Sequence, residues 1–236
     1  MNDYYKYYFI SNEIEGSSER ILAKNELVYS LLEPFLPAKA SVLELGVGKG
    51  WFARTCIGHG HSYHGIEANA GQCSELEAQG ISITCGRMPP VPVDGEYGLV
   101  YSAHLIEHLA GSEMVHELLT DCTRLLAPGG IMALLFPDAM AMGSHFWNCD
   151  YTHVWPTTER RVAQVLTDAG FTVGAVHKLC GHYTGARRLA ARIGSRQAVL
   201  RAAQAIARNP ERRDICYRGW MYLQQDILLI AKARTG

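Results

Sequence analysis

The stretch VLELGVGKG (residues 42–50) decides the fold. In it an apolar run leads into three glycines, Gly46, Gly48 and Gly50, which have the spacing G-x-G-x-G. Glycine at these positions lets the chain turn sharply and lets a ligand approach the main chain closely. The stretch therefore predicts a buried strand, a glycine loop and the start of a helix.

Residues around this loop indicate what kind of ligand it would hold. A dinucleotide fingerprint would place its third glycine at position 51, where Trp51 is too large for a pyrophosphate turn. Glu44 is awkward beside a pyrophosphate but suits a cation with an ammonium and a sulfonium group. Glu67 ends the next expected strand and is placed to accept both ribose hydroxyls.

The chain repeats this strand–helix alternation, which predicts an α/β protein. We expect a Rossmann-like, seven-stranded, mostly parallel sheet with helices on both faces. The expected strands cover residues 41–46, 62–68, 81–86, 97–104, 131–137, 171–179 and 226–233. The expected domains are an N-terminal helical cap (1–40), a core (41–179 and 219–236) and an Arg-rich helical insertion (180–218).

Composition favours a folded, soluble and cytoplasmic protein. Hydrophobic residues make up 48% of the 236 residues and charged residues 19%. The chain has no apolar run of the length that spans a membrane. Its seven cysteines form no C-x-x-C pair, so we expect reduced thiols. The net charge of the chain is −1, but the charge is unevenly distributed, since residues 185–236 alone carry +8.

The pentapeptide HLIEH (residues 104–108) matches the H-x-x-E-H pattern of inverted zinc peptidases. Such a site needs both histidines within one long helix, whereas His104 falls at the end of an expected strand. The surrounding pattern therefore disfavours a peptidase.

Several motifs, in order, resemble those of the class I S-adenosylmethionine-dependent methyltransferases over roughly residues 40–178. They are ELGVGKG as the cofactor loop, GIEAN as the ribose-binding segment, IEHL after the fourth strand and LLAPGGIMALLFPD around the fifth. DYTHVWPTTERRVAQVLTDAGF is similar to a segment of small-molecule and sugar methyltransferases. The resemblance implies S-adenosyl-L-methionine as cofactor and an antiparallel last strand.

The resemblance also implies which residues contact the cofactor. Some relatives bind a divalent metal near IEHL with two acids and a histidine, but His104 replaces the first acid, so we predict no metal. Arg87 stands where the family often has an acid for the adenine, so a backbone carbonyl at Cys85 or Gly86 would accept instead. The predicted cofactor-binding residues are Glu44, Gly46, Gly48, Gly50, Glu67, Ala68, Gly86, Arg87, Met88, Ser102 and His104.

Methyl transfer to a protonated acceptor needs a base, and histidine suits that role near neutral pH. His104, His108, His145 and His153 lie on the carboxyl side of the expected sheet. We favour His153 as the base, with Asp150 orienting its imidazole and His104 lining the cleft. The predicted catalytic residues are therefore His153, Asp150 and His104.

Aromatic and basic residues indicate how an acceptor would be held. We expect four aromatic side chains to form one wall of the acceptor site. Four tyrosines near the N-terminus are a second hypothesis, as a lid that closes over the cofactor. The arginines of the insertion form either a solvated surface, a lid for an anionic small-molecule or sugar acceptor, or a peripheral membrane contact. The pI near 6.8 argues against nucleic acid. The wall residues are Phe146, Trp147, Tyr151 and Trp155, and the lid residues are Tyr4, Tyr5, Tyr7 and Tyr8.

The sequence thus predicts a methyltransferase that acts on oxygen or nitrogen of a small molecule or glycan precursor. The alternative is a non-catalytic S-adenosylmethionine-binding protein that keeps the fold for regulation or partner binding. The residues do not indicate an oligomeric state.

Overall fold

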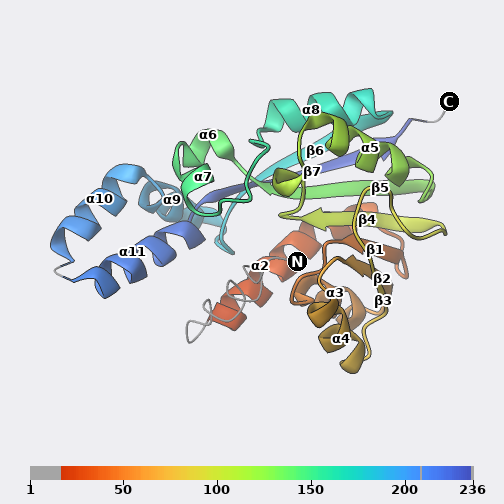
Figure 1. Cartoon of the computed structure of the whole chain (residues 1–236), viewed down its shortest axis with the longest axis horizontal. Coiled ribbons are helices and arrows are strands. Elements are labelled where there is room, and N and C mark those ends of the chain that lie inside the picture. Colours follow the sequence, from red (N-terminus) through yellow and green to blue (C-terminus); the bar gives the residue numbers. More distant parts are fainter. Residues whose placement is uncertain (1–16, 208, 235–236) are drawn as a thin grey trace.

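The computed structural model describes residues 17–207 and 209–234. Its centre is a seven-stranded sheet in the order β3-β2-β1-β4-β5-β7-β6 (Figure 1). Strand β7 is antiparallel to both of its neighbours and the other pairs are parallel, which confirms the predicted fold class. The strands are β1 (Ser41–Leu45), β2 (Ser62–Glu67), β3 (Ile83–Cys85), β4 (Tyr97–Ala103), β5 (Leu126–Pro137), β6 (Phe171–Cys180) and β7 (Gln225–Ala233).

Helices cover both faces of the sheet because successive side chains of a strand point to opposite faces. On one face, Val42 of β1 joins a core cluster with α2 and α3, whereas Leu43 and Leu45 join a cluster with α5 and α8 on the other. The helices are α2 (Ser17–Leu32), η1 (Glu33–Phe35), α3 (Trp51–Gly58), α4 (Ala70–Ala78), η2 (Ile106–His108), α5 (Ser112–Thr123), α6 (Ala139–Met142), α7 (His145–Asn148), α8 (Glu159–Asp168), α9 (Gly185–Gly194), α10 (Gln197–Ile206) and α11 (Pro210–Tyr222).

The strand order reverses at β1, which lies between β2 and β4. The chain leaves β1 towards β2 and β3, then returns to the other side of β1 as β4. In open α/β sheets this reversal leaves a crevice at the carboxyl ends of the two strands, where ligands bind. Leu45 pairs with both Ile66 and Ser102, so the ends of β1, β2 and β4 meet at one edge.

The structure corrects the expectation that all thiols are reduced. Cys73 of α4 and Cys85 of β3 form a disulfide with a Cα–Cα distance of 5.9 Å. Their separation of 12 residues matches no cysteine motif, and only the return of the chain from α4 to β3 brings them together. The other five cysteines are free thiols.

The loop after β5 contains two short helices, α6 and α7, that the sequence pattern did not predict. Asp138 is the N-cap of α6, because its carboxylate accepts hydrogen bonds from the backbone N–H groups of Met140 and Ala141. Helix α7 follows at once and buries Phe146 completely. These helices carry the chain over the carboxyl edge of the sheet towards residues 149–155.

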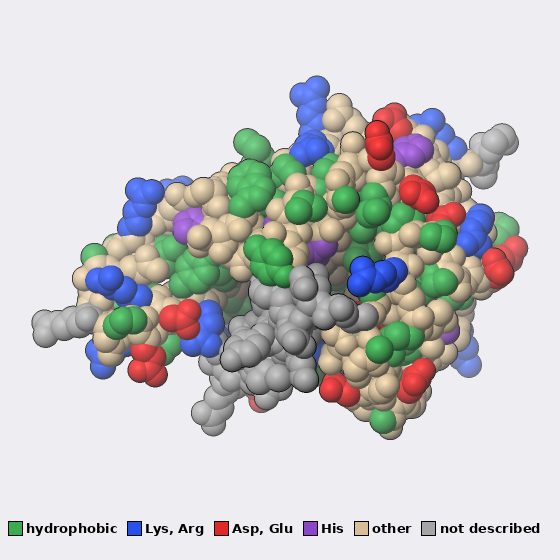
Figure 2. All heavy atoms as spheres, viewed as in Figure 1, with side chains coloured by type: hydrophobic (Ala, Val, Ile, Leu, Met, Phe, Trp, Pro, Cys, Tyr) green, Lys and Arg blue, Asp and Glu red, His purple; other side chains and the backbone are tan. Residues whose placement is uncertain are grey.

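Three helices, α9, α10 and α11, lie between β6 and β7 and extend beyond the end of the sheet (Figure 1). Trp220 anchors this group: it is buried, and its indole Nε1 donates to the Arg196 carbonyl at 3.3 Å. Lys and Arg side chains are spread over this end of the molecule (Figure 2). Among the described helices, none is long and apolar enough to span a bilayer. The described part of the predicted cap (1–40) contains α2 and η1, and the four N-terminal tyrosines lie outside the described residues.

Candidate functional site

The glycine loop connects β1 to α3 and has a left-handed backbone. The φ angles are 78° at Gly46, 55° at Gly48 and 71° at Gly50, a region that favours glycine. A Cβ at Gly48 would enter open space, whereas a Cβ at Gly50 would lie 2.6 Å from Leu76 Cδ2. Gly48 therefore leaves room for a ligand, and Gly50 allows α3 and α4 to pack.

Glu67 is bound to this loop by backbone amides. Its Oε2 accepts from the Gly48 N–H at 2.8 Å, and its Oε1 accepts from the Asn69 N–H at 2.9 Å. Each carboxylate oxygen keeps a second lone pair, so the two oxygens can accept a pair of ribose hydroxyls. The structure thus brings Glu67 and the glycine loop together as predicted.

Glu44 lies on β1 with 3% of its surface exposed. Burial raises the pKa of this carboxyl to about 8, although the hydrogen bond that it accepts from the Tyr63 hydroxyl at 2.5 Å acts in the opposite direction. A nearby cation would favour the charged carboxylate, so the buried position suits a bound ammonium group.

The other predicted cofactor residues lie at or just beyond the ends of β2, β3 and β4. Gly86 donates its N–H to the Glu67 carbonyl at 2.9 Å, and the buried Ser102 hydroxyl donates to the Leu45 carbonyl at 3.2 Å. Arg87 and Ala68 are exposed, and Met88 is partly buried against the core. Ser102 therefore holds β4 to the end of β1, and its hydroxyl proton is engaged there.

A polar cluster begins directly beyond β4. His104 has a φ of 51°, the only left-handed φ among the described non-glycine residues. Its Nδ1 lies 3.3 Å from Glu107 Oε1, and its Nε2 lies 3.8 Å from Asp226 Oδ2. Asp226 also accepts from Lys24 Nζ at 2.5 Å.

Asp226 and Lys24 are polar residues of this cluster that sequence reasoning missed. Asp226 lies near the start of β7, and because that strand is antiparallel its first residues lie at the carboxyl edge of the parallel strands. The direction of β7 is the signal that would have identified Asp226. No sequence signal indicates Lys24, which lies 202 residues from its partner.

The structure gives Asp150 a different partner from the predicted one. Its Oδ1 accepts from the Thr152 N–H at 2.8 Å and from the Thr152 hydroxyl at 2.6 Å. The hydroxyl oxygen of Thr152 lies 2.8 Å from His108 Nδ1. Asp150 thus orients His108 through Thr152, because its carboxylate is held in a turn with residue 152. His153 Nδ1 instead lies 2.6 Å from the Phe146 carbonyl oxygen.

Residues Glu107, His108 and His153 are close to one another. One potential ligand atom of each lies within 4.8 Å of the other two, and the rings of the two histidines are 4.9 Å apart. Glu107 is completely buried, and among the described residues neither of its carboxylate oxygens has a hydrogen-bond partner. Burial lowers the pKa of His108, which favours its neutral form.

Two of the four predicted wall residues are accessible. Trp147 and Tyr151 are 54% and 61% exposed, whereas Phe146 and Trp155 are buried. Phe146 and Trp155 therefore pack into the protein interior. The expectation that all four residues face an acceptor is wrong.

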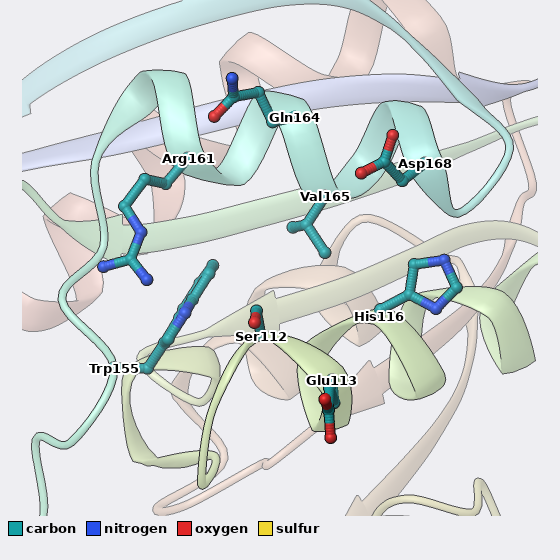
Figure 3. Close-up of a pocket in the computed structure, with 8 residues that line it drawn as sticks. All are labelled: Ser112, Glu113, His116, Trp155, Arg161, Gln164, Val165 and Asp168. Carbon is teal, nitrogen blue, oxygen red and sulfur yellow. The ribbon is translucent and has the colours of Figure 1, made fainter.

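A hollow of about 500 Å³ lies between α5 and α8 (Figure 3). Arg161 of α8 stacks over the Trp155 ring at 4.9 Å, and His116 of α5 lies at the other end. The hollow contains none of the predicted cofactor residues and lies on an outer helical face. A smaller hollow of about 190 Å³ lies beside the loop and includes Lys49 and Trp51. The glycine loop, the ends of β1 and β2 and Glu67 meet elsewhere, at the carboxyl edge of the sheet.

The fold and this edge of the sheet together define a class I, Rossmann-like methyltransferase architecture. The profile of the family described as "Methyltransferase domain" matches residues 19–176, more than half of the chain. The chain therefore belongs to the methyltransferase-domain family, and its cofactor is S-adenosylmethionine. Three features fit that cofactor: the open space beside Gly48, the remaining lone pairs of the Glu67 carboxylate and the buried carboxyl of Glu44.

Solved structures show the same fold. An S-adenosylmethionine-dependent methyltransferase from Clostridium acetobutylicum has a TM-score of 0.66 at 9% identity, with 99% of this chain and 100% of that chain covered. One from Archaeoglobus fulgidus has a TM-score of 0.59 at 21% identity, with 88% and 94% covered. The cyclopropane synthase MmaA2 from Mycobacterium tuberculosis has a TM-score of 0.57 at 16% identity, with 88% and 83% covered. No curated protein matches the sequence.

Proposed function

We propose that the protein transfers a methyl group from S-adenosylmethionine to an oxygen or nitrogen atom of a small molecule or glycan precursor. The adjacency of two groups carries this proposal. The Gly48–Glu67 pair lies at the ends of β1 and β2, and the polar cluster begins one residue beyond β4. Since β1 and β4 pair directly, a methyl donor and an acceptor would meet at one edge of the sheet.

The cofactor residues have separate roles in this proposal. Glu67 accepts the ribose hydroxyls, Glu44 faces the ammonium group, and Gly48 leaves its main chain open to the ligand. Bound S-adenosylmethionine supplies a methyl group already activated by its sulfonium. The protein therefore mainly has to hold donor and acceptor at reacting distance, which supplies much of the acceleration.

The acceptor side contains the residues for proton removal. His153 donates from Nδ1 to the Phe146 carbonyl, which leaves Nε2 as the nitrogen that can accept a proton. The exposed rings of Trp147 and Tyr151 would contact the acceptor. The arginines of α9–α11 would attract an anionic acceptor, and contact with an anionic membrane is the alternative role for this surface.

A methyl-transfer assay with labelled S-adenosylmethionine tests the proposal. The acceptors would be phosphosugars, amines and phenols, and the variants His153→Ala and His177→Ala, a matched histidine on β6. Turnover by the wild type, reduced roughly 100-fold in His153→Ala but not in His177→Ala, would support a catalytic role for His153. A loss within twofold would remove His153 from that role. Cofactor binding without turnover on any acceptor would favour the non-catalytic alternative.

A further inference from the structure

Glu107 is a buried carboxylate that lies beside the imidazoles of His108 and His153. Its side chain is completely inaccessible, and among the described residues neither oxygen accepts a hydrogen bond. The Nδ1 of His104 lies 3.3 Å from Oε1 but without hydrogen-bond geometry. Burying a carboxylate in this way is costly unless a cation is bound beside it.

Two imidazoles face this carboxylate with defined tautomers. Because the Phe146 carbonyl can only accept, the Nδ1 of His153 must carry a proton. The Thr152 hydroxyl gives its proton to Asp150 and so accepts from His108 Nδ1. Both histidines therefore carry their free lone pair on Nε2. Hydrogen bonds from the opposite ring nitrogen to a carbonyl or carboxylate are typical of metal-binding histidines.

We propose that Glu107, His108 and His153 bind a first-row divalent metal ion. One ligand atom from each lies within 4.8 Å of the others. Ligand atoms at about 2.1 Å from a shared ion are separated by roughly 3 to 4 Å, so the three side chains would close by about 1 Å on binding. This proposal departs from the sequence prediction of no metal.

The ligand set indicates the kind of ion. Two imidazole nitrogens and one carboxylate suit Zn²⁺, Co²⁺, Mn²⁺ or Fe²⁺, whereas Mg²⁺ and Ca²⁺ prefer oxygen ligands. The site differs from that of an inverted zinc peptidase, because His104 is not one of the three proposed ligands and residues 106–108 form a single 3₁₀ turn. Three protein ligands leave at least one position for a small molecule.

The role of the ion in catalysis rests on the proposed function, whereas metal binding itself does not. An acceptor hydroxyl bound to the ion would lose its proton to solvent more easily. Its oxygen would then bond to the methyl carbon while the electron pair of the carbon–sulfur bond stays on sulfur. His153 would act as a metal ligand in this scheme, so it would not also accept the proton.

Titration of chelator-treated full-length protein with Zn²⁺, and with Co²⁺ followed by visible absorption, tests the site. The variants are Glu107→Gln, His153→Ala and Thr152→Val, and His116→Ala on α5 is the control with one histidine removed elsewhere. We expect one Zn²⁺ per chain, affinity at least 10-fold weaker in Glu107→Gln and His153→Ala, and about 10-fold weaker in Thr152→Val. His116→Ala should bind as the wild type does.

Melting curves keep the test valid if a variant is poorly folded. Zn²⁺ should raise the melting temperature of the wild type and of His116→Ala, but not that of a folded Glu107→Gln. Absence of one-to-one binding, or unchanged affinity in Glu107→Gln, would overturn the proposal. A parallel titration with S-adenosylmethionine separates the two claims: metal binding without cofactor binding contradicts only the proposed function, and cofactor binding without metal binding contradicts only the metal site.

Discussion

The two halves of the candidate site differ in how completely their polar groups are paired. On the cofactor side, both oxygens of Glu67 accept backbone hydrogen bonds. On the acceptor side, both oxygens of Glu107 are buried, and neither accepts a hydrogen bond from the part of the chain that the structure describes. The first half is held by backbone hydrogen bonds, whereas the second contains a buried carboxylate that relies on neighbouring imidazoles. Glu44 is the exception on the cofactor side, because it is a buried carboxyl that accepts its hydrogen bond from the Tyr63 hydroxyl.

The largest expected effect concerns Glu44, because its protonation makes the stability of the folded protein depend on pH. The folded protein raises the pKa of Glu44 to about 8, so it keeps a proton that the unfolded chain has already lost above pH 5. Deprotonation therefore favours unfolding, and the stability of the ligand-free protein should fall as pH rises from about 5 to about 8. The contribution of Glu44 to this fall is up to about 4 kcal/mol, since one pKa unit corresponds to about 1.4 kcal/mol.

Urea unfolding across this pH range, on wild type and Glu44→Gln, measures that contribution. The glutamine variant should lose most of the slope, because an amide does not titrate. An equal slope in both proteins would mean that Glu44 is ionised in the folded state, and the contrast with Glu67 would disappear.

The next effect concerns how the acceptor half is held together. The Lys24–Asp226 ion pair joins α2 to β7 and is largely buried, with side-chain exposures of 20% and 9%. Lys24→Ala should reduce the free energy of unfolding by about 2 kcal/mol, because Asp226 is left without its strongest partner. The matched control is Lys178→Ala, which breaks an exposed pair with Glu159 and should cost about 0.5 kcal/mol or less. Equal losses in urea unfolding would show that burial of Asp226 is unimportant.

The smallest expected effects on stability distinguish Gly48 from Gly50 in the glycine loop. Gly50→Ala should reduce stability by about 1–2 kcal/mol, because its φ is 71° and its Cβ would contact Leu76. Gly48→Ala should cost less stability, since a Cβ there meets open space, but should weaken S-adenosylmethionine binding about 10-fold by filling that space. Thermal melting and calorimetry separate the two outcomes. Similar profiles for both variants would contradict the assignment of the open side of the loop.

The same contrast explains what could be predicted from the sequence. Gly46, Gly48 and Glu67 belong to one strand–helix–strand unit, and the parallel pairing expected between its two strands places the end of the second strand beside the glycine loop. The pairing of Asp150 with Thr152 is also local, but two polar neighbours competed for its carboxylate and the pattern did not show which would win. Prediction of the relay to His108 needed the position of a turn 44 residues away.

Long-range contacts were beyond sequence reasoning for a different reason. The disulfide between Cys73 and Cys85 depends on the return of the chain from α4 to β3, and the ion pair of Asp226 with Lys24 depends on how α2 packs against β7. These contacts arise from the packing of whole elements. Local patterns predicted the elements themselves, and hence the sheet, far better than they predicted which side chains would meet.

Calorimetric titration with S-adenosylmethionine and its demethylated product tests the central claim most directly. The proteins would be the wild type, Glu67→Ala and Glu77→Ala, an exposed acid on α4 that serves as control. We predict binding at one site, weakened by about 100-fold in Glu67→Ala, which corresponds to about 2.7 kcal/mol for lost hydrogen bonds to a charged group, and unchanged in Glu77→Ala. Equal affinity in wild type and Glu67→Ala, or no binding of either ligand, would contradict the account.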